Sequence, residues 1–60
     1  MPYINIKHAG PLTREQKKEI AKEVTETMQR VANKPASYTY ITFDEVAYED
    51  WAIGGKLLDE

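Results

Sequence analysis

The sequence predicts an α/β (α+β) protomer with a β-α-β order of elements, and three observations lead to this prediction. Polar and apolar residues alternate near the start of the chain, an amphipathic helical pattern follows, and a run rich in β-branched and aromatic residues comes next. Two strands joined by a helical crossover lie parallel, with the helix against one face of the sheet. A chain of 60 residues makes one domain at most, so we expect a single domain over residues 1–60.

The first strand is expected over Tyr3–His8, because side chains there alternate with the period of two that a strand requires. One face carries Ile4, Ile6 and His8, and the other carries Tyr3, Asn5 and Lys7. This pattern is typical of a half-buried strand, so we expect one covered face and one open face.

The helix is expected to begin at Arg14 and to end before Pro35. Thr13 and Gln16 have the spacing of a capping box, in which each side chain binds a main-chain amide at the helix start. Asn33 suits the left-handed conformation that ends many helices, and the proline beyond it prevents continuation. The apolar positions recur every three or four residues and form one stripe, which consists of Ile20, Val24, Met28 and Val31.

The second strand is expected over Tyr38–Val46, where β-branched and aromatic residues are dense. The segment Trp51–Leu57 is expected to form a short hairpin or strand that bends at two glycines. It is too apolar for a solvated tail, so we place it across a neighbouring subunit. Two strands with open edges and one helix are not independently stable, which favours pairing with other copies.

Composition argues against several function classes. A net charge of −2 with mixed signs gives no basic surface for nucleic acid. No apolar run approaches the roughly 18 residues of a membrane span, and no leader is recognisable, so a cytoplasmic protein is expected. The chain has no cysteine, and the spacing of carboxylates such as Asp44 and Glu49 fits no calcium loop. We therefore expect no metal and no cofactor, and we expect stability to come from a homo-oligomer.

Pro2 is the first candidate for chemistry, because it directly follows the initiator methionine. Removal of Met1 by an aminopeptidase would leave a free prolyl secondary amine, which is a general base that needs no side chain. An amide nitrogen takes up no proton near neutrality, so the same atom is inert while Met1 stays attached. The alternative interpretation is a proline that merely opens a strand, where a missing amide donor costs little.

Several short motifs follow one another along the chain. They are Met1-Pro2 before a strand, Glu15-Gln16-Lys17 at the helix start, Asn33-Lys34-Pro35 after the helix, Asp44-Glu45-Val46 at the strand end, and the aromatic-Ala-Ile-Gly-Gly stretch at 51 to 55. Each motif is weak alone, but their order and spacing are specific, and together they resemble the 4-oxalocrotonate tautomerase family over essentially the whole chain. The resemblance implies a β-α-β protomer, commonly assembled as a hexamer built from dimers, with the amino-terminal proline in an apolar pocket at a subunit boundary.

The resemblance also implies an activity. Family members interconvert enol and keto forms of 2-oxo acids by moving a proton between oxygen and carbon. Pro2 would be the base in a 1,3- or 1,5-proton transfer on a small 2-oxo acid or 2-hydroxy-dienoate. Burial lowers the pKa of an amine, so such a proline is partly neutral near pH 7. The aromatic residue that makes the family's pocket apolar is matched by Trp51.

Two arginines of the family pattern are not matched, since Leu12 and Tyr40 stand at their positions. Without these guanidinium groups the bidentate grip on carboxylates is lost, which puts the dicarboxylate substrate of the founding enzymes in doubt. Arg14 and the Tyr40 phenol are the candidates to polarise the substrate carbonyl instead. Tyr38 and Tyr40 share a strand face, and such a face is more often a contact between subunits than a site. Trp51 is ambiguous in the same way, since a large aromatic side chain at a subunit boundary also anchors interfaces.

Two alternatives stay open. A protonated Pro2 that acts as an acid would fit a dehalogenase or decarboxylase of the same superfamily. A non-catalytic oligomeric module, which keeps the scaffold while its site degenerates, would account for the unmatched arginines.

Overall fold

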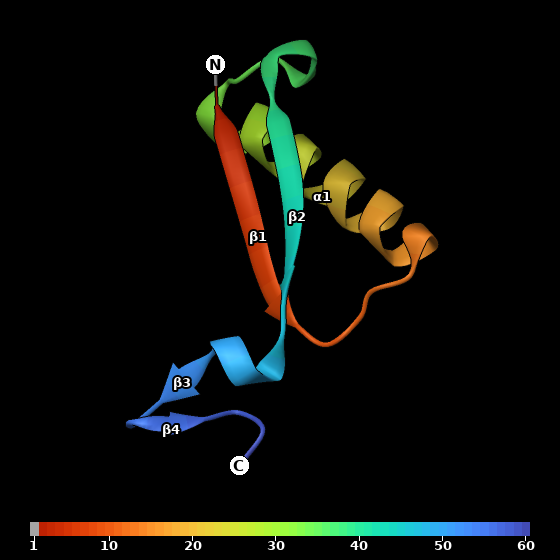
Figure 1. The fold of residues 1–60 in the computed structure, drawn as a ribbon. Coiled ribbons are helices and arrows are strands. Elements are labelled where there is room, and N and C mark those ends of the chain that lie inside the picture. The colour runs from red at the N-terminus through yellow and green to blue at the C-terminus, as the bar shows by residue number, and fades with distance from the viewer. Residues whose placement is uncertain (1) are drawn as a thin grey trace.

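The computed structural model describes residues 2–60, and the expected removal of Met1 concerns a residue outside this range. The elements, in chain order, are β1 (Tyr3–Ala9), α1 (Arg14–Ala32), the 3₁₀ turn η1 (Ala36–Tyr38), β2 (Tyr40–Val46), the 3₁₀ turn η2 (Tyr48–Asp50), β3 (Ala52–Ile53) and β4 (Lys56–Leu57). Helix α1 lies against one face of the β1–β2 sheet, and the β3–β4 hairpin extends past one end of it (Figure 1). The predicted β-α-β protomer with a short hairpin is confirmed.

β1 and β2 pair in parallel, from Tyr3 opposite Tyr40 to Ala9 opposite Val46. Exposed and half-buried side chains alternate along β1 as far as His8, which confirms the alternation predicted for this strand. β1 extends one residue beyond the predicted end, because Ala9 still pairs with Val46. The covered face carries isoleucines of both strands, and the opposite face is open.

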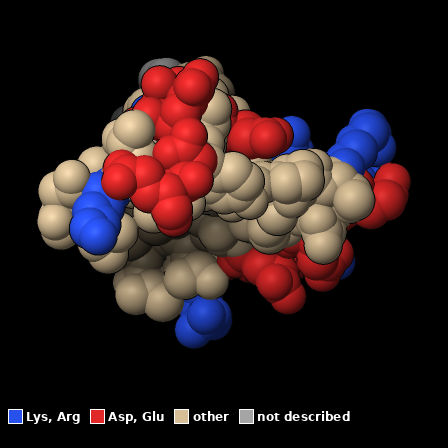
Figure 2. Space-filling model, turned by 60° about the horizontal axis from the view of Figure 1, so that its bottom comes forward, with Lys and Arg blue, Asp and Glu red and all other residues tan. Residues whose placement is uncertain are grey.

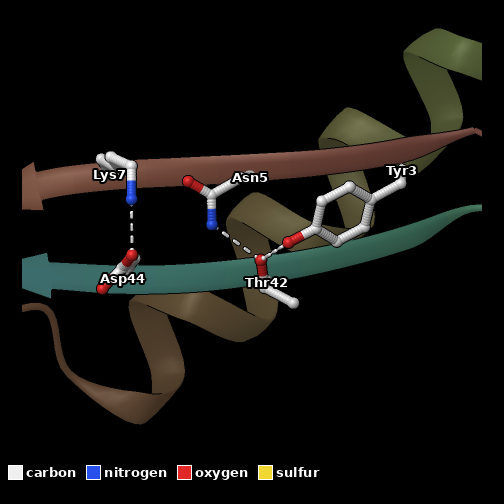
Figure 3. Close-up of polar contacts among 5 residues, drawn as sticks. All are labelled: Tyr3, Asn5, Lys7, Thr42 and Asp44. Atoms are coloured by element: carbon white, nitrogen blue, oxygen red, sulfur yellow. Dashed lines mark hydrogen bonds and ion pairs between the residues drawn. The ribbon is translucent and has the colours of Figure 1, made fainter.

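The open face is polar and its side chains bind one another across the two strands (Figure 3). The Thr42 hydroxyl lies 2.7 Å from the Tyr3 hydroxyl and accepts a hydrogen bond from the Asn5 amide nitrogen at 2.8 Å. Two residues further along each strand, Lys7 Nζ donates to an Asp44 carboxylate oxygen at 2.6 Å. These contacts satisfy polar groups within the sheet, so this face differs from an apolar core face.

The ends of α1 follow the predicted capping signals. Thr13 Oγ1 accepts from the Gln16 main-chain N–H at 3.1 Å, and Gln16 Oε1 accepts from the Thr13 N–H at 2.9 Å, which completes the capping box. Asn33 adopts the left-handed conformation with φ 56°, and its N–H donates to the Gln29 carbonyl. The helix is therefore fixed at both ends by side chains and conformations that the sequence specifies.

The predicted start of the second strand is wrong by two residues, since β2 begins at Tyr40. Ala36–Tyr38 forms a 3₁₀ turn instead. The carbonyl oxygen of Pro35 accepts both the Tyr38 N–H at 3.1 Å and the Thr39 hydroxyl at 3.1 Å. In a strand these groups would be free to pair with the neighbouring strand. Because local hydrogen bonds occupy them here, the strand does not extend into this segment in spite of its aromatic residues.

The predicted hairpin is confirmed, with Ala52 opposite Leu57 and Ile53 opposite Lys56 in antiparallel pairing. Gly54 and Gly55 have φ values of 60° and 84°, which is the pair of positive angles that a tight two-residue hairpin requires. Trp51 lies just before β3, and its carbonyl accepts from the Leu58 N–H at 2.8 Å.

The protomer has no buried residue within the described range 2–60, and eight large apolar or aromatic side chains are exposed. The radius of gyration is 14.3 Å, against about 10 Å for a compact chain of this length. A protomer of this shape lacks a closed core, which agrees with the expectation that other copies supply the missing contacts. Within the same range, no helix has the length and hydrophobicity needed to cross a membrane.

Candidate functional site

Pro2 lies at the end of the sheet where β1 and β2 both begin, and we call this region the proline end (Figure 1). Its members are Pro2, Tyr3, Tyr38, Tyr40 and the last turn of α1. Pro2 is half-buried, and its carbonyl oxygen accepts a hydrogen bond from the Tyr40 N–H at 3.0 Å. The side chains of Tyr3 and Tyr40 are 62% and 51% exposed, so the aromatic groups beside the proline are available to another molecule.

The other predicted site residues lie at the opposite end, which we call the hairpin end. It comprises the turn after β1, the start of α1, η2 and the β3–β4 hairpin. Leu12 is half-buried in the turn, and Arg14 is the first residue of α1. The Arg14 side chain is 84% exposed and its guanidinium lies 3.7 Å from the neighbouring Glu15 carboxylate. The Arg14 side chain is therefore largely solvated.

Trp51 also belongs to the hairpin end, where it lines a hollow of about 330 Å³ together with Lys7, Val46 and Asp50. Lys7 also forms an ion pair with Asp44 on the open sheet face, at 2.6 Å. The residues that line this hollow thus include an aromatic, a basic and an acidic one, and its volume suits a small molecule.

His8 is held in one tautomer beside this region. Its Nδ1 donates to the Gly10 carbonyl oxygen at 2.7 Å, since a carbonyl can only accept. In the neutral ring the Nε2 atom is then an acceptor, and it is buried without a hydrogen-bond partner in the protomer described over residues 2–60. Gly10 has φ +88°, and Tyr48 packs directly above it. His8 and Tyr48 thus fix the turn that carries Leu12.

Whether one protomer can form the whole predicted site depends on the distance between the proline end and the hairpin end. β1 and β2 run parallel over seven residues each, so Pro2 before β1 and Trp51 after β2 are separated by the length of the sheet, about 20 Å. Of the five predicted site residues, the protomer brings together Pro2 and Tyr40 at one end and places Leu12, Arg14 and Trp51 at the other. A single protomer therefore holds two parts of the predicted site and not the whole.

Comparison with known proteins assigns this fold and these residues to a family. A family model described as tautomerase enzyme matches residues 2–60. A probable tautomerase from Bacillus cereus is 32% identical over 60 residues, covering 100% of this chain and 98% of that protein. The crystal structure of DmpI from Helicobacter pylori has a TM-score of 0.90 at 33% identity, covering 97% of this chain and 91% of the other. Structures of the 4-oxalocrotonate tautomerase isozymes from Methylibium petroleiphilum match with a TM-score of 0.86 at 28% identity, covering 97% and 94%.

The chain belongs to the 4-oxalocrotonate tautomerase family. As a member of the tautomerase superfamily it has the scaffold of an isomerase. The match over residues 2–60 includes the segment from Pro2 to the hairpin, so both ends of the sheet belong to the common scaffold of the family.

Two features of this tautomerase scaffold were not predicted from sequence. Asp50 was not singled out from the sequence, yet it lies in η2 and lines the hollow together with Trp51 and Lys7. The tautomer of His8 was also missed. A glycine with positive φ two residues after a histidine is the local signal that would have indicated it, since that conformation places the carbonyl within reach of Nδ1.

Proposed function

We propose that this protein is a tautomerase that converts a small 2-hydroxy-dienoate or related enol into its 2-oxo form, with Pro2 as the general base. The observation that carries the proposal is the combination of family membership with a half-buried proline that opens β1. After removal of Met1 the nitrogen of Pro2 becomes a secondary amine. The protein acts as a single domain over residues 1–60 in the cytoplasm, without a cofactor.

In this reaction the nitrogen of Pro2 both accepts the proton and returns it. The neutral Pro2 amine takes the proton from the enol oxygen, and the substrate becomes a dienolate. The resulting ammonium returns the proton to carbon, at C3 in a 1,3-transfer or at C5 in a 1,5-transfer, and the 2-oxo product leaves. No proton is gained or lost overall, so a single group serves as base and then as acid.

The negative charge that develops on the substrate oxygen requires a donor nearby. Tyr40 is the candidate donor, because its main-chain N–H is bonded to the Pro2 carbonyl oxygen and so holds the residue beside the proline. Its phenol would donate to the oxyanion, with the proton aimed where charge accumulates. Arg14 and Leu12 would reach the same substrate only from another copy, since they lie at the hairpin end of their own protomer.

The site is completed between copies, and we propose a homo-hexamer for the assembly. Trp51 of a neighbouring copy would cover Pro2 and make its surroundings apolar, which favours the neutral amine. No residue between 2 and 60 is buried in the isolated protomer, which supports an obligate oligomer. Leu12 and Tyr40 at the positions of the family arginines support a substrate with fewer carboxylates than a dicarboxylate.

Replacement of the proline tests the proposal. Pro2→Ala should lower the turnover of 2-hydroxyhexa-2,4-dienoate by about 100-fold or more, because the base is replaced by a different amine on a more mobile residue. Pro35→Ala is the matched control, since it removes a proline ring but keeps the carbonyl that binds Tyr38 and Thr39. Intact mass must show that Met1 is absent from each preparation. Unchanged turnover by Pro2→Ala would reject the assignment.

A further inference from the structure

A carboxylate substrate is bound best by a cation, and neither residue at the positions of the family arginines is basic. The chain has eight lysines and arginines. Five of them belong to α1, Lys34 follows directly after it, and Lys56 lies in β4. The eighth is Lys7, which lines the hollow together with Trp51. Lys7 is thus the cation beside the residue that matches the family aromatic.

The sheet positions Lys7 and leaves it free to bind a ligand. Its Nζ donates to an Asp44 carboxylate oxygen at 2.6 Å, from one strand of the sheet to the other (Figure 3). An ammonium group has three N–H donors, so this ion pair leaves donors for a further acceptor. The side chain of Lys7 is 60% exposed, so a molecule in the hollow can reach it. The ion pair therefore orients the cation without using up its hydrogen-bonding capacity.

Asp50 adds a negative charge to the same hollow. It lies in η2 directly before Trp51, and its main-chain N–H donates to the Ala47 carbonyl oxygen at 2.9 Å. Its carboxylate makes no hydrogen bond or ion pair with any of residues 2–60. Figure 2, which brings this end of the protomer forward, shows acidic side chains gathered over it and basic ones toward the margins. The hollow therefore holds one cation, already paired, and one carboxylate without a counter-ion among these residues.

We propose that Lys7 binds the carboxylate of the substrate in the hollow beside Trp51, and that Asp50 restricts this site to substrates with a single carboxylate. The proposal rests on the proposed tautomerase function and names its substrate class. Val46 and the Trp51 indole would contact the hydrocarbon chain of the substrate. A second carboxylate would find no cation of its own among the lining residues and would be repelled by Asp50. The substrate is therefore a 2-hydroxy-dienoate whose far end is uncharged.

Two substrates that differ only at C6 test the role of Asp50. 2-Hydroxyhexa-2,4-dienoate ends in a methyl group, and 2-hydroxyhexa-2,4-dienedioate ends in a second carboxylate. The wild type should have a higher kcat/KM for the monocarboxylate, by about ten-fold or more. Asp50→Asn should raise kcat/KM for the dicarboxylate by about ten-fold and change that for the monocarboxylate by less than about three-fold. The ratio of the two values within one preparation does not depend on the fraction of folded protein.

Glu49→Gln is the matched control for this substitution. It removes the same charge from the neighbouring residue of η2, which does not line the hollow. The ratio of the two kcat/KM values should therefore stay at the wild-type level. An equal rise for Glu49→Gln and Asp50→Asn would overturn the role of Asp50, because net charge alone would then account for the selectivity.

Removal of the cation tests the role of Lys7. Lys7→Met keeps most of the aliphatic stem and should raise KM for the monocarboxylate by about 30-fold with little change in kcat, because the carboxylate is charged in both substrate and transition state. Lys7→Met with Asp44→Asn removes both members of the ion pair and should bind the substrate as weakly. Recovery of the wild-type KM by the double variant would overturn the role of Lys7, since the single variant would then act through an unpaired Asp44. Lys56→Met, in a hairpin position that does not line the hollow, should leave KM unchanged.

A binding measurement separates this inference from the tautomerase function itself. Trp51 is the only tryptophan of the chain, so its fluorescence reports on the hollow directly. Hexanoate should bind the wild type more tightly than hexanedioate does, and Lys7→Met should abolish hexanoate binding. Turnover that Pro2→Ala leaves unchanged would reject the tautomerase function, and this inference about its substrate with it. If turnover depends on Pro2 but Asp50→Asn leaves the substrate ratio unchanged, or hexanoate binding survives Lys7→Met, the inference alone is overturned.

Discussion

The main-chain N–H of Tyr40 donates to the carbonyl oxygen of Pro2 at 3.0 Å, so the first residue of β2 is bound to the residue that precedes β1. This bond begins the parallel ladder at the Tyr3–Tyr40 pair. It fixes the direction in which the proline ring leaves the sheet without using the proline nitrogen. The contact uses the Pro2 carbonyl, so it would leave the nitrogen unoccupied once Met1 is removed.

The Tyr40 phenol is the first group to test around this bond. Tyr40→Phe keeps the main-chain contact to Pro2 and removes only the hydroxyl. If the hydroxyl stabilises the oxyanion, kcat should fall by about 100-fold with little change in KM, because the donor acts on charge present in the transition state. Tyr3→Phe is the matched control, since its hydroxyl is already bound to Thr42 on the open face. If both substitutions lower kcat equally and only slightly, Tyr40 acts only in the contact between subunits and not on the substrate.

The turn after β1 gives a prediction about stability. A Cβ placed on Gly10 would lie 2.9 Å from the Tyr48 hydroxyl oxygen, and Gly10 has φ +88°. Gly10→Ala should lower the free energy of unfolding by about 2 kcal/mol through backbone strain and this clash. Adding Tyr48→Phe removes the obstructing oxygen, since the ring carbon is at an ordinary 3.9 Å. The double variant should recover part of the loss, measured by urea unfolding at one fixed protein concentration. If the double variant recovers none of the lost unfolding free energy, backbone strain at residue 10 alone accounts for the loss.

Local signals in the sequence predicted most of the protomer. Thr13 with Gln16 predicted the helix start because both capping bonds are made by residues three apart. Gly54 and Gly55 likewise indicated the hairpin. The start of β2 was missed because the Pro35 carbonyl binds two groups at once, and such competition between a turn and a strand leaves no periodic signal.

The sequence predicted less of the candidate site than of the fold. Pro2 was recognisable by position, and Trp51 by its match to a family aromatic. Their placement at opposite ends of the sheet follows from the parallel order of β1 and β2, which residue types alone do not express. The hollow beside Trp51 depends on η2, whose three residues are too few for a recognisable pattern.

The pH dependence of turnover separates the base from the acid function of Pro2. If the neutral amine takes the first proton, kcat/KM should rise with pH as the free enzyme loses the ammonium proton, and then reach a plateau. A dehalogenase or decarboxylase that needs the ammonium would show the reverse, with activity lost as pH rises. Pro2→Ala provides the reference, because a primary amine titrates differently and should move the transition if the amine is the titrating group. A transition that does not move would assign it to another residue.

Mixing two inactive variants tests whether the site is shared between copies. Pro2→Ala removes the base at the proline end, and Trp51→Ala removes the indole at the hairpin end. Because these residues are separated by about 20 Å within a protomer, a site formed in trans would combine them from different copies. Co-refolding the two variants should then restore activity well above the mean of the separate proteins, since some sites receive an intact Pro2 from one copy and an intact Trp51 from the other. A site formed within one protomer would instead give no gain on mixing, as every copy carries one defect. Mixtures of each variant with itself, refolded identically, control for the refolding step.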